Sequence, residues 1–311
     1  MNDLQAAVGE YLHLRRALGF KLHNTERQLR RFVDFMRRHR ASFITTALAL
    51  QWATKSTKCH PGNWRNRLIV VRCFARFRFA SDPRTEIPPP GLLPQRYRRT
   101  TRSIPTDDDV SRLLEAAKRV RAPKRLWGAT HVTILGLLAV TGMRVGEVVA
   151  LEHQDVDLQA GILTIRHAKF GKSRLVPLHP STVEALRSYA RRRDKIIPAC
   201  SATRFFTSEC GTRLTAKFIG KIFLQLARRA GFRAPQGRTG PRLHDLRHRF
   251  AVRTLVAWYR DGVNVERRLP VLATYLGHLN VATTYWYLSA TPELLAMAVR
   301  RAEQPILGGT L

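Results

Sequence analysis

Prolines crowd into one short stretch of this 311-residue chain and divide it in two. Five of them, at positions 83, 88, 89, 90 and 94, fall between Ser81 and Arg102. Proline fixes φ and removes a backbone donor, so this density stops helices and favours extended chain. A chain of this length also suits two domains better than one small core. We therefore expect one domain at residues 1–82, a linker at 83–103 and a second domain at 104–311.

The first domain is predicted to be helical, because apolar residues recur at helical spacing over residues 25–40 and 63–80. The apolar stripe of the second helix consists of Trp64, Leu68, Val71, Ala75 and Phe79. Three arginines, Arg65, Arg72 and Arg76, lie on other faces of that helix. Any one of them fits a solvated face, whereas the set favours a surface that faces phosphates.

The second domain is predicted to be mostly helical with a small antiparallel sheet. Helices are expected after a Thr106 cap, over 127–140, around 218–226 and onward to about residue 301, and strands over 162–165 and 174–176. Ser181 and Glu184 have the spacing of a capping box for a further helix. The fold class expected for the whole chain is therefore mainly α.

The charge of the chain predicts an anionic partner. Lys and Arg number 54 against 22 Asp and Glu, a formal net charge of +32. Nucleic acid, an anionic membrane or an acidic protein could neutralise it, and the predominance of arginine favours phosphate. The apolar run Ile134–Val140 is too short to span a bilayer, and the N-terminus lacks the plan of a secretion signal. We expect a cytoplasmic protein with no membrane partner.

No cofactor is expected. The four cysteines, Cys59, Cys73, Cys200 and Cys210, lack metal-binding spacing and are interpreted as reduced thiols. The sequence also offers no carboxylate cluster for magnesium and no glycine-rich phosphate loop for ATP.

Four short segments carry candidate chemistry, and the first is Thr141–Glu147. Gly142 allows a sharp turn, and a helix is predicted to begin at about Arg144. An arginine at a helix N-terminus suits an anion, and Glu147 could hold it in place. The same residues would also fit an ordinary corner between helices with a surface arginine.

The second and third segments add basic groups. His167–Arg174 lies between the two strands and places Lys169 on a hairpin, where a solvated basic turn is the alternative. In Leu243–His248, the side chains of His244 and Arg247 would share a helix face. That pair combines a group that titrates near neutrality with a permanent cation, as phosphoryl chemistry requires.

The fourth segment, Leu276–Tyr287, places Tyr287 nine residues after His278. Two residues along a helix is a rotation of about 200°, so Tyr285 and Tyr287 should point to nearly opposite sides. The alternative is that Tyr285, Trp286 and Tyr287 are all core aromatics.

In this order, the four segments resemble the tyrosine recombinase (phage integrase) family. Its pattern is Thr-Gly-x-Arg-x-x-Glu, a hairpin lysine, His-x-x-Arg, Gly-His and a tyrosine nine residues after that histidine. The matching residues here are Arg144, Lys169, His244, Arg247, His278 and Tyr287. The resemblance covers roughly residues 104–301, and the first domain looks like the helical core-binding domain that usually precedes it.

The resemblance implies strand cleavage by Tyr287, which would form a 3′-phosphotyrosyl bond. With Tyr287 as the nucleophile, we expect Tyr285 to face the domain interior and Thr283 to share the open face of Tyr287. Arg144 and Arg247 would clamp the non-bridging oxygens, and His278 would donate a third contact. Lys169 would protonate the leaving 5′-oxygen; it is preferred to Lys172 because similar proteins carry their lysine at the first position of the turn.

His244 would assist proton transfer at the tyrosine. The implied partners are double-stranded DNA, further copies of the chain in a synaptic tetramer, and accessory recombinases. The segment Asp82–Glu86 hints at a mobile-element recombinase encoded in a group of three. A final helix, capped by Thr291, could pack on its own domain or on a neighbouring protomer.

Two other functions share much of this pattern. A type IB topoisomerase would use the same chemistry as a monomer on one duplex, and the apolar final helix favours the recombinase instead. A non-catalytic DNA-binding protein on a decayed scaffold would be expected to have lost at least one of the six residues, and none is lost.

Overall fold

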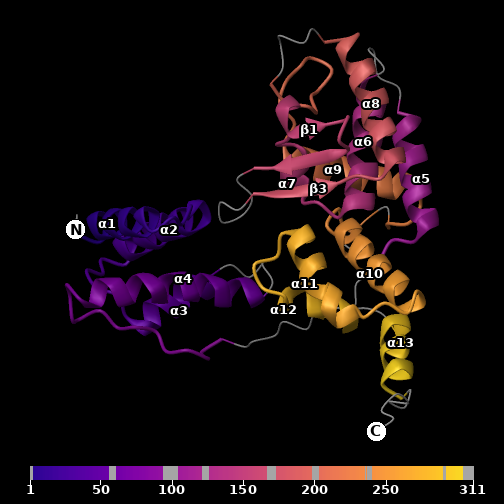
Figure 1. Ribbon diagram of the computed structural model, residues 1–311. Coiled ribbons are helices and arrows are strands. Elements are labelled where there is room, and N and C mark those ends of the chain that lie inside the picture. The colour runs from indigo at the N-terminus through magenta and orange to yellow at the C-terminus, as the bar shows by residue number, and fades with distance from the viewer. Residues whose placement is uncertain are drawn as a thin grey trace. The chain divides into compact units, whose positions relative to one another are not determined.

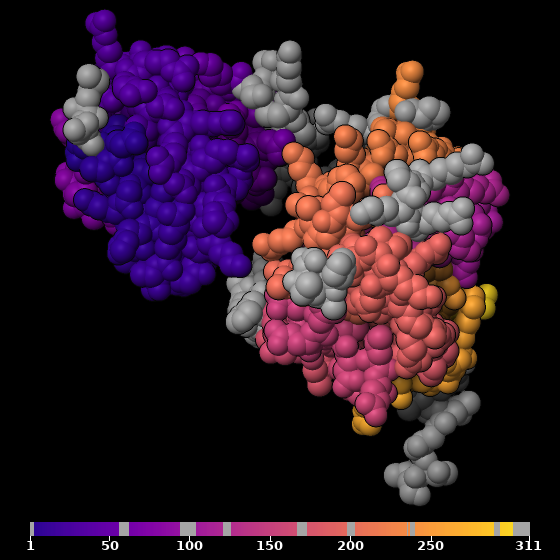
Figure 2. Space-filling view, turned by 90° about the horizontal axis from the view of Figure 1, so that it is seen from above, coloured from indigo at the N-terminus to yellow at the C-terminus, as the bar shows by residue number. Residues whose placement is uncertain are grey.

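The computed structural model describes residues 3–55, 61–93, 104–120, 126–166, 173–197, 203–234, 236, 240–289 and 292–303. The chain forms two compact units, unit 1 (Met1–Thr100) and unit 2 (Thr101–Leu311). Helices dominate both, and unit 2 also has a small antiparallel sheet (Figure 1). The expected fold class is confirmed. Figure 2 shows the packed surface of unit 1 in indigo to purple and that of unit 2 in magenta to yellow.

The helices described in unit 1 are α1 (Asp3–Ala17), α2 (His23–Arg38), α3 (Thr46–Thr54) and α4 (Pro61–Phe79). The predicted helical stripe of α2 is buried in their common core, with Phe32 and Met36 fully enclosed. On α4, Leu68, Val71 and Ala75 are buried, whereas Phe79 is exposed. The stripe therefore covers most of α4 and stops before its last turn.

The proline segment begins against unit 1. Arg72 of α4 donates from Nε to the carbonyl oxygen of Pro88 and from Nη2 to that of Pro89, each at 2.6 Å. The backbone N–H of Glu86 donates to the carbonyl of Ile44 at 2.8 Å. Residues 83–93 of the expected linker are therefore anchored to unit 1. Two of the N–H groups of Arg72 are used in these backbone contacts. Residues 94–103 lie outside the described part.

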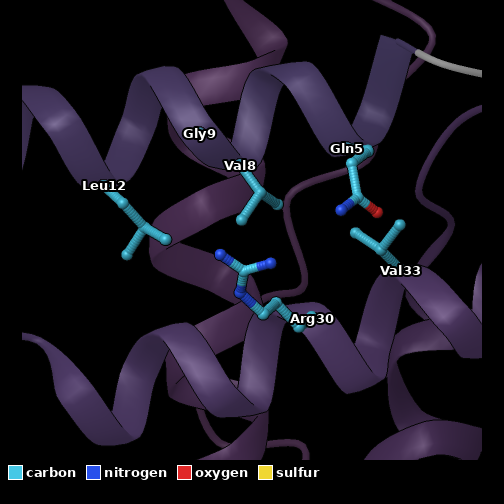
Figure 3. Close-up of a pocket in the computed structure, with 6 residues that line it drawn as sticks. All are labelled: Gln5, Val8, Gly9, Leu12, Arg30 and Val33. Carbon is cyan, nitrogen blue, oxygen red and sulfur yellow. The ribbon is translucent and has the colours of Figure 1, made fainter.

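A small pocket lies between α1 and α2 (Figure 3). Its lining residues are Gln5, Val8, Gly9 and Leu12 of α1 with Arg30 and Val33 of α2. The guanidinium of Arg30 points toward α1 in this view and is paired with Glu26 at 2.8 Å. The pocket carries no nucleophile or titratable acid, so it is a packing feature of the helix pair.

The elements described in unit 2 are α5 (Asp107–Lys118), α6 (Leu126–Thr141), α7 (Val145–Val148), η1 (His153–Asp155), β1 (Val156–Asp157), β2 (Ile162–Ile165), β3 (Arg174–Pro177), α8 (Pro180–Asp194), α9 (Ala216–Arg229), α10 (Asp245–Arg260), α11 (Val265–Leu276), α12 (Ala282–Tyr285), η4 (Trp286–Ser289) and α13 (Pro292–Glu303). The strands form one antiparallel sheet in the order β1-β2-β3. In its register Ile165 pairs with Arg174 and Leu163 with Val176.

Helix caps in unit 2 follow the sequence in one case and depart from it in another. Thr106 caps α5 as predicted, in a reciprocal box with Asp109. The capping box expected from Ser181 is wrong, because α8 already begins at Pro180 and its cap is His179. Proline suits the first helical position, because its φ is already fixed for a helix and it lacks an N–H that would need a partner. The helix therefore begins at Pro180, before the expected cap at Ser181.

Two hydrophobic cores meet along α10. The first is built from α5, α6, the sheet, α8 and α9, and α10 contributes Leu246 to it. The second joins α10, α11, η4 and α13, and α10 contributes Ala251 and Leu255. Arg247 lies between these two sets of α10 side chains. The junction of the two cores therefore places a charged residue inside unit 2.

In the part of the chain that the structure describes, we find no helix with both the length and the apolar character needed to cross a membrane. The two cysteines within that part, Cys73 and Cys210, are exposed free thiols.

Candidate active site

Two helices end beside each other in unit 2 and leave backbone carbonyls without helical partners. Helix α6 is followed directly by Gly142, where φ is +61°, and α11 by Gly277, where φ is +68°. Only glycine adopts such angles without strain. The last carbonyls of a helix carry partial negative charge and need donors from elsewhere. These helix ends therefore form a binding site for cationic groups.

Arg247 fills part of this site from the first turn of α10. Its Nη1 donates to the carbonyl of Gly142 at 2.8 Å, and its Nη2 donates to that of Leu276 at 2.6 Å. Its residue surface is only 2% exposed. Burial, with the nearby Arg144 charge, lowers the pKa of Arg247 to about 10. The guanidinium is thus still charged at neutral pH.

Arg144 binds the same end of α11. It is the N-cap residue of α7, as the predicted helix start requires. Its Nη2 donates to the carbonyl of Gly277 at 2.8 Å, and its Nη1 donates to Oε1 of Glu147 at 2.8 Å. The expected contact with Glu147 is confirmed. The side chain is 29% exposed, so part of the guanidinium faces solvent.

Glu147 also binds an arginine that the sequence analysis did not select. Arg174 of β3 donates from Nη1 to Oε1 at 3.1 Å and from Nη2 to Oε2 at 2.7 Å. Burial acts to raise the pKa of Glu147, but hydrogen bonds from Arg174 and from the Arg144 backbone outweigh it, and the pKa lies below its ordinary value. The carboxyl is therefore ionised.

A signal for Arg174 was present in the sequence. Side chains alternate between the two faces of a strand. Arg174 and the buried Val176 share the inner face of β3, whereas Leu175 between them is exposed. A charged residue on the buried face with an apolar one outside is an inverted pattern, which is a mark of a functional site.

His278 follows Gly277 directly and joins the cluster. Its Nδ1 lies 2.8 Å from Oγ1 of Thr284. Burial, and then the charges of Arg247 and Arg144, lower the pKa of His278 to about 4. Its imidazole is neutral at pH 7 and can donate a hydrogen bond from only one nitrogen.

Tyr287 lies against this cluster from within the second core. Its ring centroid is 6.1 Å from that of His278, with the planes 18° apart, and 5.4 Å from that of His248. The residue is 2% exposed. Burial raises its pKa, and the neighbouring Arg247 acts in the opposite direction.

The expected orientation of the two tyrosines is wrong. Tyr285 is 50% exposed, whereas Tyr287 is buried. The reason is the local helix geometry, since α12 ends at Tyr285 and a 3₁₀ turn follows. Residues three apart line up in a 3₁₀ turn, so Tyr287 shares the inward face of the fully buried Thr284 and not the face of the exposed Thr283.

His244 and Lys169 complete the predicted set. His244 is the N-cap residue of α10, one turn before Arg247, and its ring centroid is 4.8 Å from that of His248. Lys169 lies outside the described residues. The structure thus gathers Arg144, Arg247, His278 and Tyr287 in one cluster with His244 at its edge.

Comparison with known families decides the relationship. The phage integrase family matches residues 105–293, more than half of the chain. The chain belongs to the phage integrase (tyrosine recombinase) family.

Relatives of this integrase-family chain extend over most of its length. A Sinorhizobium fredii protein named as an integrase or recombinase, y4rB, is 47% identical over 310 residues, 98% of each chain. The tyrosine recombinase XerD of Mycobacterium tuberculosis is 32% identical over 231 residues, 73% of this chain and 70% of that protein.

Solved structures share the fold. The Tn1549 transposon integrase in complex with transposon right-end DNA superposes with a TM-score of 0.68 at 17% identity, over 95% of this chain and 98% of that one. The XerH recombinase in its post-cleavage complex with a palindromic difH substrate gives a TM-score of 0.65 at 20% identity, over 90% and 80%. At these identities the likeness concerns the fold.

The described residues include no group of three or more His, Cys, Asp or Glu side chains placed to hold a metal ion. The charged groups at this site are instead guanidiniums and one carboxylate.

Gly277→Ala should destabilise the protein more than Gly262→Ala. Both glycines have nearly the same φ, +68° and +67°, so both substitutions carry the left-handed penalty of about 1–2 kcal/mol. A Cβ at Gly277 would also lie 2.8 Å from Nη1 of Arg174, whereas one at Gly262 meets no atom within 4 Å. Urea unfolding of the two variants measures the difference. Equal losses of unfolding free energy would contradict the close packing of the arginines around Gly277.

His278 should titrate near pH 4 in the folded protein. Its ordinary pKa is 6.5, so the unfolded chain takes up a proton that the folded site resists. The stability contribution of a neutral His278 is therefore lost as the pH falls from about 6.5 to about 4. NMR titration of the Cε1–H resonance, assigned with His278→Gln, measures the midpoint. A midpoint near the ordinary value would contradict the burial beside two arginines.

Proposed function

We propose that the chain is a site-specific DNA recombinase that cuts and rejoins strands through a 3′-phosphotyrosyl intermediate, with Tyr287 as the nucleophile. One observation carries the proposal: two guanidiniums, of Arg144 and Arg247, are fixed on adjacent helix-end carbonyls beside a tyrosine. Relatives named as integrases or tyrosine recombinases support the reaction class.

The site carries the charge that a scissile phosphate needs. Three arginines, Arg144, Arg174 and Arg247, surround one carboxylate, Glu147, which leaves an excess of positive charge. Arg144 uses two of its five N–H donors on Glu147 and Gly277. The remaining donors and its solvent exposure suit it to bind a non-bridging phosphate oxygen.

The reaction follows from these groups. The Tyr287 oxygen attacks phosphorus, the phosphotyrosyl bond forms, and the bond to the 5′-oxygen breaks. Arg144 and Arg247 stabilise the negative charge that builds on the non-bridging oxygens, and His278 donates a further hydrogen bond. The covalent bond conserves the energy of the phosphodiester, so a free 5′-hydroxyl can reverse the reaction without an external energy source.

Two proton transfers accompany the exchange. Lys169, which lies on the β2–β3 connection in sequence, protonates the leaving 5′-oxygen, and His244 assists removal of the tyrosine proton. In the conformation described, Tyr287 is buried and cannot meet a phosphate. We propose that DNA binding draws η4 away from the second core and exposes the hydroxyl.

The proposed partners are duplex DNA and further copies of the chain. Unit 1 would serve as the core-binding domain, and its arginine-rich helices would contact phosphates. A lambda integrase tetramer bound to a Holliday junction shares the fold, with a TM-score of 0.55 at 18% identity. Helix α13 buries Leu294 in its own domain and leaves Leu295 and Val299 exposed for a neighbouring protomer. Integration or excision of a mobile element in the cytoplasm is the proposed setting.

Tyr287→Phe should abolish the covalent protein–DNA adduct, and Tyr285→Phe should retain it. Each substitution removes one oxygen, so folding and DNA binding should persist in both. The assay traps the adduct on a nicked suicide substrate in EDTA, with mass spectrometry of the attached residue. Because the exposed Tyr285 is the more accessible hydroxyl, the pair separates position in the cluster from mere accessibility. An adduct on Tyr285, or one from Tyr287→Phe, would show that the nucleophile is misassigned.

Arg144→Ala and Arg247→Ala should each slow cleavage by about a hundredfold to a thousandfold, because each removes a contact made to developing charge. DNA affinity should change little. Single-turnover cleavage and DNA binding are measured side by side, with Arg253→Ala as the control from α10, since Arg253 pairs with Asp107. Parallel losses of affinity and rate would mean that the two arginines only hold DNA.

A further inference from the structure

We infer that Arg174 is a positioning residue for the reaction, which fixes the guanidinium of Arg144 through Glu147 and holds the end of α11 in place. The inference rests on the proposed function, because it assigns Arg144 to the scissile phosphate. The side chain of Arg174 is itself nearly buried, at 9% exposed, and need not touch DNA.

The first support is that the two arginines together occupy the acceptor sites of the Glu147 carboxylate. Its Oε1 accepts from Nη1 of Arg144 and from Nη1 of Arg174, at 2.8 and 3.1 Å. Its Oε2 accepts from the backbone N–H of Arg144 and from Nη2 of Arg174, at 2.9 and 2.7 Å. A carboxylate has about four acceptor sites, so each arginine takes half of them. Without Arg174, Glu147 could rotate and carry the Arg144 side chain with it.

The second support is a contact with the helix end. Nε of Arg174 donates to the carbonyl of Tyr275 at 2.8 Å. The next two carbonyls along the chain hold the other arginines, since Leu276 accepts from Arg247 and Gly277 accepts from Arg144. Three guanidiniums thus bind three consecutive carbonyls. Arg174 is the one that links this helix end to the sheet.

The third support is energetic. The side chains of Arg174 and Glu147 are 9% and 8% exposed. A buried ion pair contributes little net stability, because desolvation offsets the attraction, and apolar residues of similar volume often serve stability as well or better. The inward-facing arginine on β3 is therefore better explained by orientation than by folding. The planar fork makes two bonds to the carboxylate at fixed angles, which lysine cannot do.

Close packing around Gly277 agrees with this role. A Cβ there would lie 2.8 Å from Nη1 of Arg174 and 3.3 Å from Nη1 of Arg144. The two guanidiniums occupy the space that a side chain would need. A glycine at this position is therefore needed for both guanidiniums to stay where they are.

The test is a double-mutant cycle in single-turnover cleavage of a nicked suicide DNA substrate, with full-length protein. Arg174→Gln should slow cleavage by about a hundredfold and leave DNA affinity within about threefold. Arg174→Lys, which keeps the charge without the fork, should fall between Arg174→Gln and the unsubstituted chain. The double variant Arg174→Gln with Arg144→Lys should cleave within about threefold of the rate of Arg144→Lys alone. The two losses do not add because both substitutions act through the same guanidinium, that of Arg144.

The matched control is Arg166→Gln. Arg166 follows β2 and pairs with another buried carboxylate, that of Asp155, at 2.6 Å. Its loss should leave cleavage unchanged. Urea unfolding of each variant separates loss of fold from loss of orientation, and if Arg174→Gln does not fold, the cycle is run with Arg174→Lys.

The inference would be overturned if both Arg174 variants cleaved at the unsubstituted rate. It would also be overturned if the rate losses of Arg174→Gln and Arg144→Lys multiplied in the double variant, or if Arg166→Gln slowed cleavage as much as Arg174→Gln. Failure of the unsubstituted chain to form any adduct is a different result. It would overturn the proposed function, and the role of Arg174 with it.

Discussion

Hydrogen bonds from two arginines to backbone carbonyls at the ends of two helices hold the candidate site together. Gly142 and Gly277 turn the chain sharply, so the last carbonyls of α6 and α11 cannot continue their helical ladders. Buried carbonyls need donors, and the guanidiniums of Arg247 and Arg144 supply them at 2.6 to 2.8 Å. Burial of Arg247 is tolerable because its guanidinium binds oriented dipoles. The helix ends thus fix the two charges on which the proposed chemistry depends.

The same charges decide the protonation of their neighbours. Burial and the arginines lower the pKa of His278 to about 4, so a histidine that would titrate near neutrality stays neutral. Glu147 stays ionised because it receives hydrogen bonds from Arg174 and Arg144. The result is a cluster with excess positive charge and one neutral donor. Such a cluster is complementary to a phosphate whose charge increases during the reaction.

Tyr287 has a place in the hydrophobic core and also a role in the proposed reaction, and the two make opposite demands on its exposure. Its ring belongs to the second core, beside Leu255 and Leu294, and contributes to the packing of α13. Its hydroxyl must nevertheless reach DNA in the proposed reaction. A residue that is 2% exposed can do so only if its segment moves. The free energy needed to expose Tyr287 therefore includes the loss of its packing in the second core.

The sequence by itself determined which residues could meet. The resemblance of four ordered segments to the tyrosine recombinase family implied the cluster of Arg144, Arg247, His278 and Tyr287. The helix start at Arg144 and the cap at Thr106 followed from local chemistry instead. This helix start and this cap depend on residues a few positions apart, where backbone geometry limits the possibilities.

Only the tertiary structure decided which way these residues face. The sequence placed Tyr285 inward, but the 3₁₀ turn after α12 buries Tyr287 in its place. It also left Arg174 unselected, since its partners lie 27 and 101 positions away along the chain. Rotation about a helix changes with each added residue, and contacts between distant segments depend on how whole elements pack. Spacing along the chain names the groups of a site, whereas packing decides which of them are buried, exposed or held in place.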